Sequence, residues 1–262
     1  MKFILWFLYK IGIQIGELYI YFGRFFSEKL TLLYQGRRDI WQKLLNFSHQ
    51  NKKTIWVHCA SLGEFEQGRP LIETIKRNHP YTFILLSFYS PSGYEIRKNY
   101  EFADLIIYLP ADLDVYNQKL IQLIKPSTVI FVKYEFWWNL IRELLENNVK
   151  VFLISGVFRE NDYFFNPIFK PFKSLLCQYE KIFVQDKLSA DVLKSNAVSN
   201  YKIVGDTRID NVIHRSKKAH LPQKIYTYVE NKKVIVYGSI WSSDMKVVGH
   251  LTGSYPEFVH IS

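Results

Sequence analysis

The chain has 262 residues, of which 48% are hydrophobic and 17% aromatic, enough for one large domain or two modest ones with a buried core. This composition excludes a disordered protein. The formal net charge of +10 suits phosphate-bearing partners such as nucleic acid, anionic lipid or nucleotide, without choosing among them. Because the sequence has no helix-turn-helix or zinc-finger pattern, we expect no nucleic-acid partner.

The cysteine and histidine pattern favours neither disulfides nor metal. Cys59 and Cys177 have no pairing motif and no metal-ligand spacing, so we expect both to be small, buried apolar residues in a reduced, cytosolic-side environment. The sequence has no HExxH, no DxD and no His/Cys pairing. We therefore expect no metal site.

Residues 1–26 are dense in Phe, Ile, Leu, Trp and Tyr. The polar interruptions of this segment are Lys10, Gln14, Glu17 and Arg24. A spanning helix needs roughly 20 apolar residues with few or no charges, and no small-x-small cleavage site follows that would indicate a signal peptide. We expect residues 1–30 to form a membrane anchor or interfacial helix, with an ordinary amphipathic core helix as the alternative. A basic flank is expected to face anionic headgroups: Arg24, Lys29, Arg37 and Arg38.

Strand-like and helix-like segments alternate after residue 50. Apolar strand-like runs occupy 54–60, 82–87, 104–108, 128–132, 149–154 and 180–184. Helix-like segments lie near 66–78, 92–99, 112–124, 137–147, 167–177 and 186–195. This alternation predicts an α/β fold, a parallel sheet covered on both faces, in one doubly wound domain over residues 50–205.

A second α/β unit begins near the end of the chain. Residues 206–232 are polar and basic, which predicts a linker. A strand over 233–237, a turn at Gly238-Ser239, a helix over 243–252 and a strand over 258–261 follow. Because a strand–helix–strand piece cannot bury both of its faces unaided, we expect residues 233–262 to be only the start of a second domain.

Four polar loops follow predicted strands of the same sheet, at 61–66, 133–139, 155–160 and 205–210. If the sheet is parallel, all four open at its carboxyl edge, where open α/β sheets build their sites. Their charged side chains, which include Glu64, Glu135, Arg159 and Arg208, would then converge. This set suits transfer of an acidic group from an activated donor: a carboxylate accepts a proton from an attacking hydroxyl, and cations stabilise the leaving phosphate.

Each of these residues has a structural alternative. Glu64 or Glu66 could cap the following helix, because carboxylates favour helix N-termini. Arg159 and Arg208 could lie in solvent or in ion pairs. His58, inside a predicted strand, is expected to be a satisfied core residue. Trp137 and Trp138 are expected to be packing residues.

Taken in order, these loops resemble one family. The segments Ser61-Leu62-Gly63-Glu64, Tyr134-Glu135-Phe136-Trp137-Trp138-Asn139, Ser155-Gly156-Val157-Phe158-Arg159 and Gly205-Asp206-Thr207-Arg208-Ile209-Asp210 resemble the 3-deoxy-D-manno-octulosonic acid (Kdo) transferases of lipopolysaccharide synthesis. The resemblance implies a B-type glycosyltransferase (GT-B) with two Rossmann-like halves. The N-terminal half would take the lipid A precursor, lipid IVA, at the cytoplasmic face of the cell inner membrane. The C-terminal half would bind the donor CMP-Kdo, in an inverting reaction without a cofactor or catalytic metal.

The resemblance also implies roles for single residues. Glu64 matches the proton acceptor, and Glu135 a residue assigned to transition-state stabilisation. Arg208 matches a second stabiliser that is more often lysine in the family, and arginine keeps the charge with a different donor geometry. The matching cleft loops contain Ser61, Gly63, Ser155, Gly156 and Arg159. Gly238 and Ser239 resemble the opening loop of the donor domain.

Three expectations concern the whole chain. The complete N-terminal Rossmann-like domain with only the start of a second one implies a C-terminally truncated transferase that binds CMP-Kdo weakly or not at all. A catalytically inactive, membrane-associated module that holds lipid or a partner protein is the alternative. A nucleic-acid-binding protein, suggested by the charge of +10, is disfavoured by the apolar N-terminus.

Overall fold

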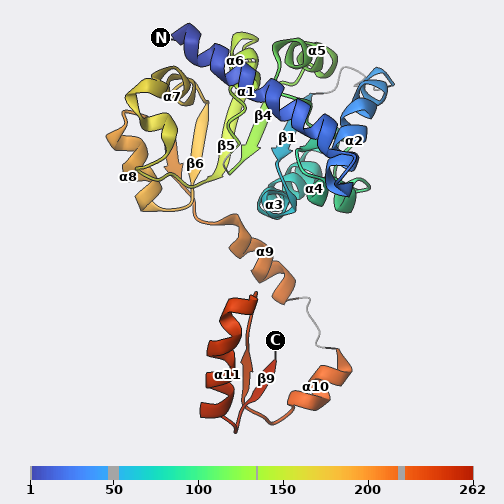
Figure 1. The fold of residues 1–262 in the computed structure, drawn as a ribbon, viewed down its shortest axis with the longest axis vertical. Helices are drawn as coiled ribbons and strands as arrows, with labels where there is room; N and C mark the ends of the chain where they lie inside the picture. The colour runs from blue at the N-terminus through green and yellow to red at the C-terminus, as the bar shows by residue number, and fades with distance from the viewer. Residues whose placement is uncertain (1, 47–52, 134, 218–221, 262) are drawn as a thin grey trace. The chain divides into compact units, whose positions relative to one another are not determined.

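The computed structural model describes residues 2–46, 53–133, 135–217 and 222–261. It divides into two compact units, Met1–Val212 and Ile213–Ser262 (Figure 1). Tyr134, part of one of the motifs above, lies outside the described residues.

The first unit is built on a seven-stranded, wholly parallel sheet. Its strands are β1 (Thr54–Cys59), β2 (Phe83–Phe88), β3 (Leu105–Tyr108), β4 (Thr128–Val132), β5 (Lys150–Gly156), β6 (Lys181–Val184) and β7 (Tyr201–Ile203). Their spatial order is β3-β2-β1-β4-β5-β6-β7. The chain therefore moves outward from β1 to β3 and returns to place β4 beside β1. Such a reversal is the switch point at which open α/β sheets hold their ligands.

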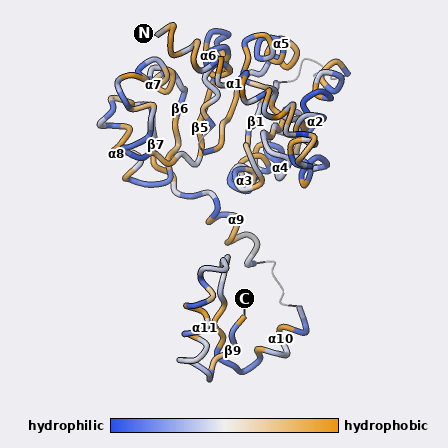
Figure 2. The backbone as a smooth tube through the Cα atoms, in the orientation of Figure 1, coloured by the Kyte–Doolittle hydropathy of each residue, from blue (hydrophilic) through white to orange (hydrophobic). Residues whose placement is uncertain are grey.

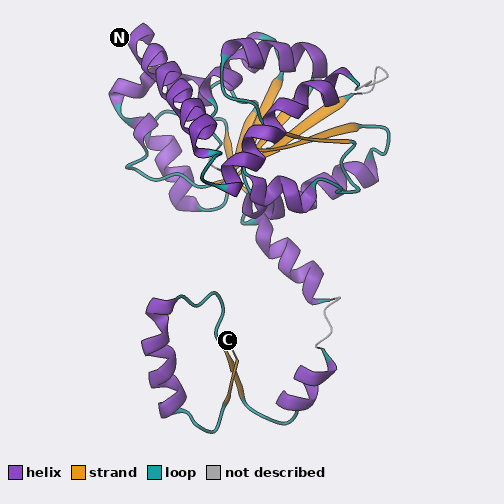
Figure 3. Cartoon of the chain, turned by 45° about the vertical axis from the view of Figure 1, so that its right-hand side comes forward, coloured by secondary structure: helices purple, strands orange, loops and turns teal. Residues whose placement is uncertain are grey.

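Helices lie on both sides of this sheet (Figure 3). They are α1 (Lys2–Gly23), α2 (Glu28–Leu45), α3 (Leu62–Asn78), α4 (Pro91–Arg97), α5 (Asp114–Ile124), α6 (Trp138–Glu146), α7 (Lys170–Leu176) and α8 (Lys187–Ser195), with short 3₁₀ turns at Tyr163–Phe165 and Pro167–Phe169. Helix α9 (Thr207–Ser216) follows β7 and includes the boundary between the two units. The central strands are buried on both faces, which explains their continuous apolar runs (Figure 2).

The predicted doubly wound pattern is confirmed, with three local differences. The six predicted strands are present within two residues of their expected ends, and the short strand expected over 201–204 before the fourth loop is present as β7 (Tyr201–Ile203). Helix α3 begins at Leu62, because Ser61 accepts a hydrogen bond from the Gly63 amide at 3.2 Å and caps the helix. No helix was predicted over α2. The linker expected over 206–232 contains the helices α9 and α10 (Gln223–Val229).

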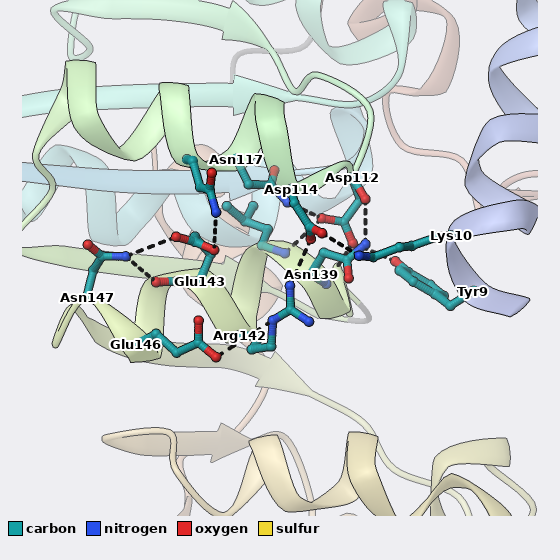
Figure 4. Close-up of polar contacts among 12 residues, drawn as sticks. Tyr9, Lys10, Asp112, Asp114, Asn117, Asn139, Arg142, Glu143, Glu146 and Asn147 are labelled. Carbon is teal, nitrogen blue, oxygen red and sulfur yellow. Dashed lines mark hydrogen bonds and ion pairs between the residues drawn. The ribbon is translucent and has the colours of Figure 1, made fainter. Parts of the chain in front are cut away.

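Helix α1 lies along the first unit and is attached to it by polar side chains (Figure 4). The Tyr9 hydroxyl donates to Asp112 Oδ2 at 2.7 Å, Lys10 pairs with Asp114, and Glu17 pairs with Arg37. Trp6 is buried edge-on to Phe172 of α7, with ring centroids 5.0 Å apart. One face of α1 therefore packs against the unit across at least two turns of helix.

The opposite face of α1 and the turn after it are apolar and exposed. The exposed side chains are Phe3, Ile4, Phe7, Leu8, Ile15, Leu18, Tyr19, Tyr21, Phe22, Phe25 and Phe26. By length and composition, residues 3–23 could cross a membrane. This exposed apolar surface is of the kind that marks a membrane or protein contact.

Two expectations about single residues are wrong. Arg37 does not face outward with the rest of the basic flank: it is buried, donates from Nε to the Leu109 carbonyl at 3.1 Å and pairs with Glu17. It thereby joins α2 to both α1 and the end of β3. Cys177 is exposed, whereas Cys59 is buried as expected, because Cys177 follows the last turn of α7 instead of facing the sheet.

The second unit contains the predicted strand–helix–strand pattern. Strand β8 (Val234–Val236) pairs in parallel with β9 (Val259–Ile261), and α11 (Met245–Ser254) connects them after a 3₁₀ turn at Ser242–Asp244. None of the described residues of this unit is buried. Two short strands and small helices do not enclose a core.

Candidate active site

The four polar loops all open at the carboxyl edge of the sheet, because the strands before them, β1, β4, β5 and β7, run in parallel. The loops that carry Glu64 and Glu135 follow β1 and β4, which are hydrogen-bonded neighbours at the switch point. The strand order therefore brings the two predicted carboxylates to adjacent positions.

Glu135 is held by donors from two elements. It is only 8% exposed. Its Oε2 accepts a hydrogen bond from the Trp137 indole at 2.7 Å and lies 3.2 Å from Nε2 of His58, a fully buried residue of β1. His58 Nδ1 in turn lies 2.8 Å from the Ser87 hydroxyl. His58 is a satisfied core residue, as predicted, but one that contacts a site carboxylate.

Trp137 and Trp138 differ in their surroundings. Trp138 is buried, stacked on Phe136 and Phe172, so its predicted packing role is confirmed. Trp137 is only partly buried and its indole nitrogen binds Glu135, so packing is not its only role.

Glu64 lies in the first turn of α3 and is half-buried. The Ser61 hydroxyl donates to its Oε2 and accepts from the Gly63 amide. The helix-capping alternative for this region is therefore in place, since Ser61 caps the helix and Glu64 stands where a carboxylate is favoured by the helix dipole. Glu66 is engaged elsewhere, in an ion pair with Arg97 at 2.9 Å.

The charges of both carboxylates act on the thiol of Cys59. Burial raises the pKa of its thiol, and the negative charges of Glu135 and Glu64 raise this pKa further. Both carboxylates thus lie within electrostatic reach of one atom at the end of β1. Among the described residues, no hydrogen bond joins Glu64 directly to Glu135.

Arg208 forms an ion pair with a third carboxylate, that of Asp206. It lies in the first turn of α9, with its side chain 57% exposed, and its guanidinium binds Asp206 through Nε at 2.8 Å and Nη2 at 2.5 Å. These hydrogen bonds hold the pKa of Asp206 below its ordinary value, and the positive charge of Lys133 lowers it further. The ion-pair alternative for Arg208 is therefore the arrangement seen.

The loops after β5 and β7 contact each other. The Ser155 hydroxyl lies 2.9 Å from that of Thr207, and Ser155 has a left-handed backbone with φ of 54°. The buried Gly156 is close-packed, since a Cβ there would come within 3.1 Å of the Phe158 ring. Arg159 is exposed; its backbone amide donates to Asp162 Oδ2 at 2.8 Å, and its carbonyl accepts from the Asp162 amide at 3.0 Å.

Lys133 was not among the predicted site residues. It directly follows β4, with a left-handed φ of 70°, and its charge acts on Asp206 at the start of the fourth loop. The sequence did contain a signal for Lys133: it stands at the end of a predicted strand, two residues before Glu135.

A pocket of about 520 Å³ opens beside Glu135, within the size range of small-molecule sites. Its lining comes from α1, the ends of β1 and β2, the Glu135 loop and the segment before α7: Tyr9, Ile13, Ala60, Tyr89, Glu135, Phe136, Trp137, Asp162, Tyr163 and Phe164. Helix α1 thus forms one wall of the pocket. Apart from Glu135 and Asp162, the walls are apolar or aromatic.

Two further predictions concern the loop expected to contact the donor and the absence of a catalytic metal. Gly238 and Ser239 come two and three residues after the end of β8 in the second unit, and Ser239 has a left-handed φ of 57°. Their contact with the donor stays a prediction. Within the described ranges, no group of three His, Cys, Asp or Glu side chains is placed to hold a metal ion. The expectation of a metal-independent reaction likewise stays a prediction.

The fold defines the class of protein. A parallel sheet with a switch point between β1 and β4 is a Rossmann-like domain, consistent with one half of a GT-B architecture. Solved structures agree: the UDP-GlcNAc 2-epimerase from Neisseria meningitidis aligns with a TM-score of 0.59 at 15% identity, over 79% of this chain and 64% of that one. A putative UDP-N-acetylglucosamine 2-epimerase from Listeria monocytogenes gives 0.58 at 12% identity, over 80% and 62%. At such identities the likeness concerns the fold alone.

The sequence then places the chain in a family. Residues 36–211 match the family model described as 3-Deoxy-D-manno-octulosonic-acid transferase (kdotransferase), and the chain belongs to this family.

Curated relatives agree with this assignment. A 3-deoxy-D-manno-octulosonic acid transferase of Aquifex aeolicus is 37% identical over 91 residues, 34% of this chain and 25% of its own length. That of Chlamydia trachomatis serovar A is 25% identical over 206 residues, 74% of this chain and 46% of its own length. A bifunctional glycosyltransferase/methyltransferase of Fusobacterium nucleatum is 26% identical over 76% of this chain and 32% of its own length. The chain thus spans less than half the length of each of these relatives.

Proposed function

We propose that this chain takes part in the transfer of Kdo from CMP-Kdo to a lipid A precursor, lipid IVA, at the cytoplasmic face of the inner membrane. The observation that carries the proposal is the pair of carboxylates, Glu64 and Glu135, at the carboxyl ends of two neighbouring parallel strands. It occurs in a chain that belongs to the Kdo transferase family. The reaction is inverting and independent of metal.

Glu64 is the proton acceptor in this proposal. An acceptor hydroxyl oxygen forms a bond to the anomeric carbon of Kdo, and its proton passes to the Glu64 carboxylate. The bond from that carbon to the CMP phosphate oxygen breaks, and CMP leaves with the electron pair. A half-buried carboxylate with a hydroxyl as its partner is accessible enough to exchange a proton with a ligand.

Glu135 and Arg208 serve as fixed charges. Glu135, buried and doubly hydrogen-bonded, suits stabilisation of the positive charge that develops at the anomeric centre. Arg208 steadies the leaving phosphate, for which its guanidinium exchanges or shares its bond with Asp206. Ser61, Gly63, Ser155, Gly156 and Arg159 line the cleft, and Gly238 and Ser239 contact the donor.

The pocket beside Glu135 suits an amphipathic acceptor. Its aromatic walls and the contribution of α1 match the acyl part of a lipid, while Glu135 approaches the sugar. The exposed apolar face of α1 lies against the membrane in this proposal. Because the Tyr9, Lys10 and Glu17 contacts hold α1 to the first unit, we favour a helix that lies on the membrane over one that spans it.

The test is transfer of Kdo from CMP-Kdo, generated in situ, to a lipid A precursor in detergent, with product detected by mass spectrometry. We expect Glu64→Gln to lower transfer by about 10²–10⁴-fold, the usual contribution of a general base, with lipid binding unchanged. Glu101→Gln, an exposed carboxylate outside the site, is the matched control and should match the original chain.

Two outcomes count against the proposal. Transfer that is equally fast with Glu64→Gln removes Glu64 as the base. A chain that binds the lipid but forms no product supports the alternative, a catalytically inactive, membrane-associated binding module.

A further inference from the structure

A continuous row of buried hydrogen bonds leads from the centre of the sheet to Glu135. The Trp56 indole donates to Ser87 Oγ at 2.7 Å, Ser87 Oγ lies 2.8 Å from His58 Nδ1, and His58 Nε2 lies 3.2 Å from Glu135 Oε2. Trp56, Ser87 and His58 are all fully buried. The row crosses three adjacent strands or their ends, β2, β1 and β4.

The chemistry of the two ends favours one direction for these bonds. An indole nitrogen only donates, so Ser87 Oγ accepts from Trp56 and is free to donate its own proton to His58 Nδ1. An ionised carboxylate only accepts, so the contact with Glu135 is favourable when His58 Nε2 carries a proton. A neutral His58 protonated on Nε2 meets both requirements at once.

Trp137 completes the arrangement. Its indole N–H donates to Glu135 Oε2 at 2.7 Å and is also directed at His58 Nε2, 3.0 Å away, which accepts it only when Nε2 carries no proton. With the proton on Nε2, Oε2 is the acceptor of the indole proton. Two donors therefore converge on one carboxylate oxygen, while in the described part of the chain Oε1 accepts no hydrogen bond.

We propose that His58 is a positioning residue: its Nε2–H group, together with the Trp137 indole, fixes the Glu135 carboxylate at the wall of the pocket. The use of this carboxylate in transfer rests on the proposed function, but the hydrogen-bond arrangement does not. A buried carboxylate without such donors would be costly, because hydrogen bonds replace the water that it loses.

Among the described residues near this carboxylate, Cys59 and Tyr179 add no charge near neutral pH. The Phe131 ring packs edge-on against the His58 ring, with centroids 5.9 Å apart. Burial raises the pKa of the Cys59 thiol and of the Tyr179 hydroxyl, and the charge of Glu135 raises both further. Both groups therefore stay protonated and neutral.

The experiment is nitrogen NMR of the histidine rings in the full 262-residue chain, which identifies the nitrogen that carries the proton. The His58 signals are those that disappear in His58→Gln. We expect a proton on Nε2 at neutral pH, a shift of the Nε2 signal in Glu135→Gln, and no shift in Glu64→Gln, the matched carboxylate that has no contact with His58. A bare Nε2, or equal responses to the two variants, would overturn the proposal.

Kinetics give the second readout. Because a hydrogen bond to a charged group typically changes a rate by about tenfold or more, we expect His58→Phe to lower kcat at least tenfold with little change in KM. His58→Gln, whose amide can still donate, should recover most of the loss, and the exposed His79→Gln is the control. Wild-type kcat in His58→Phe contradicts the proposal. A chain without any transfer contradicts the proposed function instead, and the NMR result stands apart from it.

Discussion

Glu64 and Glu135 lie at the same end of the sheet, but different local structures hold them there. Glu64 is placed by a regular helix start, in which Ser61 caps α3. Glu135 lies in an irregular loop before α6 and depends on the His58 and Trp137 side chains. The first carboxylate is half-buried and the second nearly enclosed. This difference suits a proton acceptor that must meet its substrate and a fixed charge that must not move.

The Asp206–Arg208 pair gives a prediction about pH. Because the guanidinium holds the pKa of Asp206 below its unfolded value, the pair contributes stability above that unfolded value, about 4, and loses it as pH falls through the folded value. We expect Arg208→Met to raise the pKa of Asp206 toward its ordinary value, as followed by carboxyl NMR. Arg208→Lys should give an intermediate pKa.

Arg159→Met is the control for this titration, since the Arg159 side chain is exposed and only its backbone contacts Asp162. The change in unfolding free energy at neutral pH should stay below about 1 kcal/mol, because the pair is largely exposed to solvent. An unchanged Asp206 titration in Arg208→Met would show that the ion pair does not form in solution.

At the scale of elements, α4 supports the start of α3. Gly93 lies in the first turn of α4, where a Cβ would come within 2.3 Å of the Phe88 ring and 3.1 Å of the Ser61 backbone. The capping residue that orients Glu64 is therefore packed directly against a glycine of the neighbouring helix. Only the absence of a side chain permits this approach.

We expect Gly93→Ala to lower the free energy of unfolding by about 1–3 kcal/mol, the usual cost of overpacking, measured by urea denaturation. Gly63→Ala is the matched control, because a Cβ there meets only Ser61 Oγ at 3.7 Å and alanine favours a helix. Equal stability of the two variants would show that α4 does not pack against the Ser61 turn as described.

Helix α1 is connected to the site through α6. Asp112 accepts hydrogen bonds from Tyr9 of α1 and from the backbone amides of Asn139 and Leu140 in the first turn of α6 (Figure 4). The loop that carries Glu135 and Trp137 directly precedes this turn. Burial raises the pKa of Asp112, although these hydrogen bonds oppose the shift. The position of α1 and the shape of the Glu135 loop therefore depend on one buried side chain.

At the scale of the whole molecule, the exposed apolar face of α1 is a surface suited to contact with a membrane. A row of large apolar side chains on one helix, next to the cations Lys29 and Arg38 of α2, matches the apolar layer and the anionic headgroups of a membrane. Arg37 does not belong to this surface, because it is buried within the first unit.

We expect the double variant Phe7→Ser, Leu18→Ser to lower binding to vesicles that contain anionic phospholipid by at least about tenfold, since burial of each side chain contributes about 1.5–3 kcal/mol. Flotation of the full chain with vesicles measures the change. Val115→Ser, an equally exposed apolar residue of α5, should bind as the original chain does. Undiminished binding of the double variant would exclude the α1 face as the contact.

The order of strands and helices in the first unit could be predicted from the sequence, because apolar runs and turn residues act locally. So could the placement of Glu64, Glu135 and Arg208 after parallel strands. Two segments escaped prediction. No helix was predicted over α2, because its basic residues were interpreted as the flank of a membrane anchor. Helices α9 and α10 lie in a stretch whose polarity favoured a linker.

The sequence by itself determined the α/β alternation, the family and the residues that stand at strand ends. Only the tertiary structure decided which of these residues meet, because contacts such as His58 with Ser87 and Glu135 depend on β1 lying between β2 and β4. It likewise decided that Arg37 is buried and that Arg208 pairs with Asp206. Periodicity records which face of an element is apolar, whereas the partner of a polar group depends on packing between segments far apart in the chain.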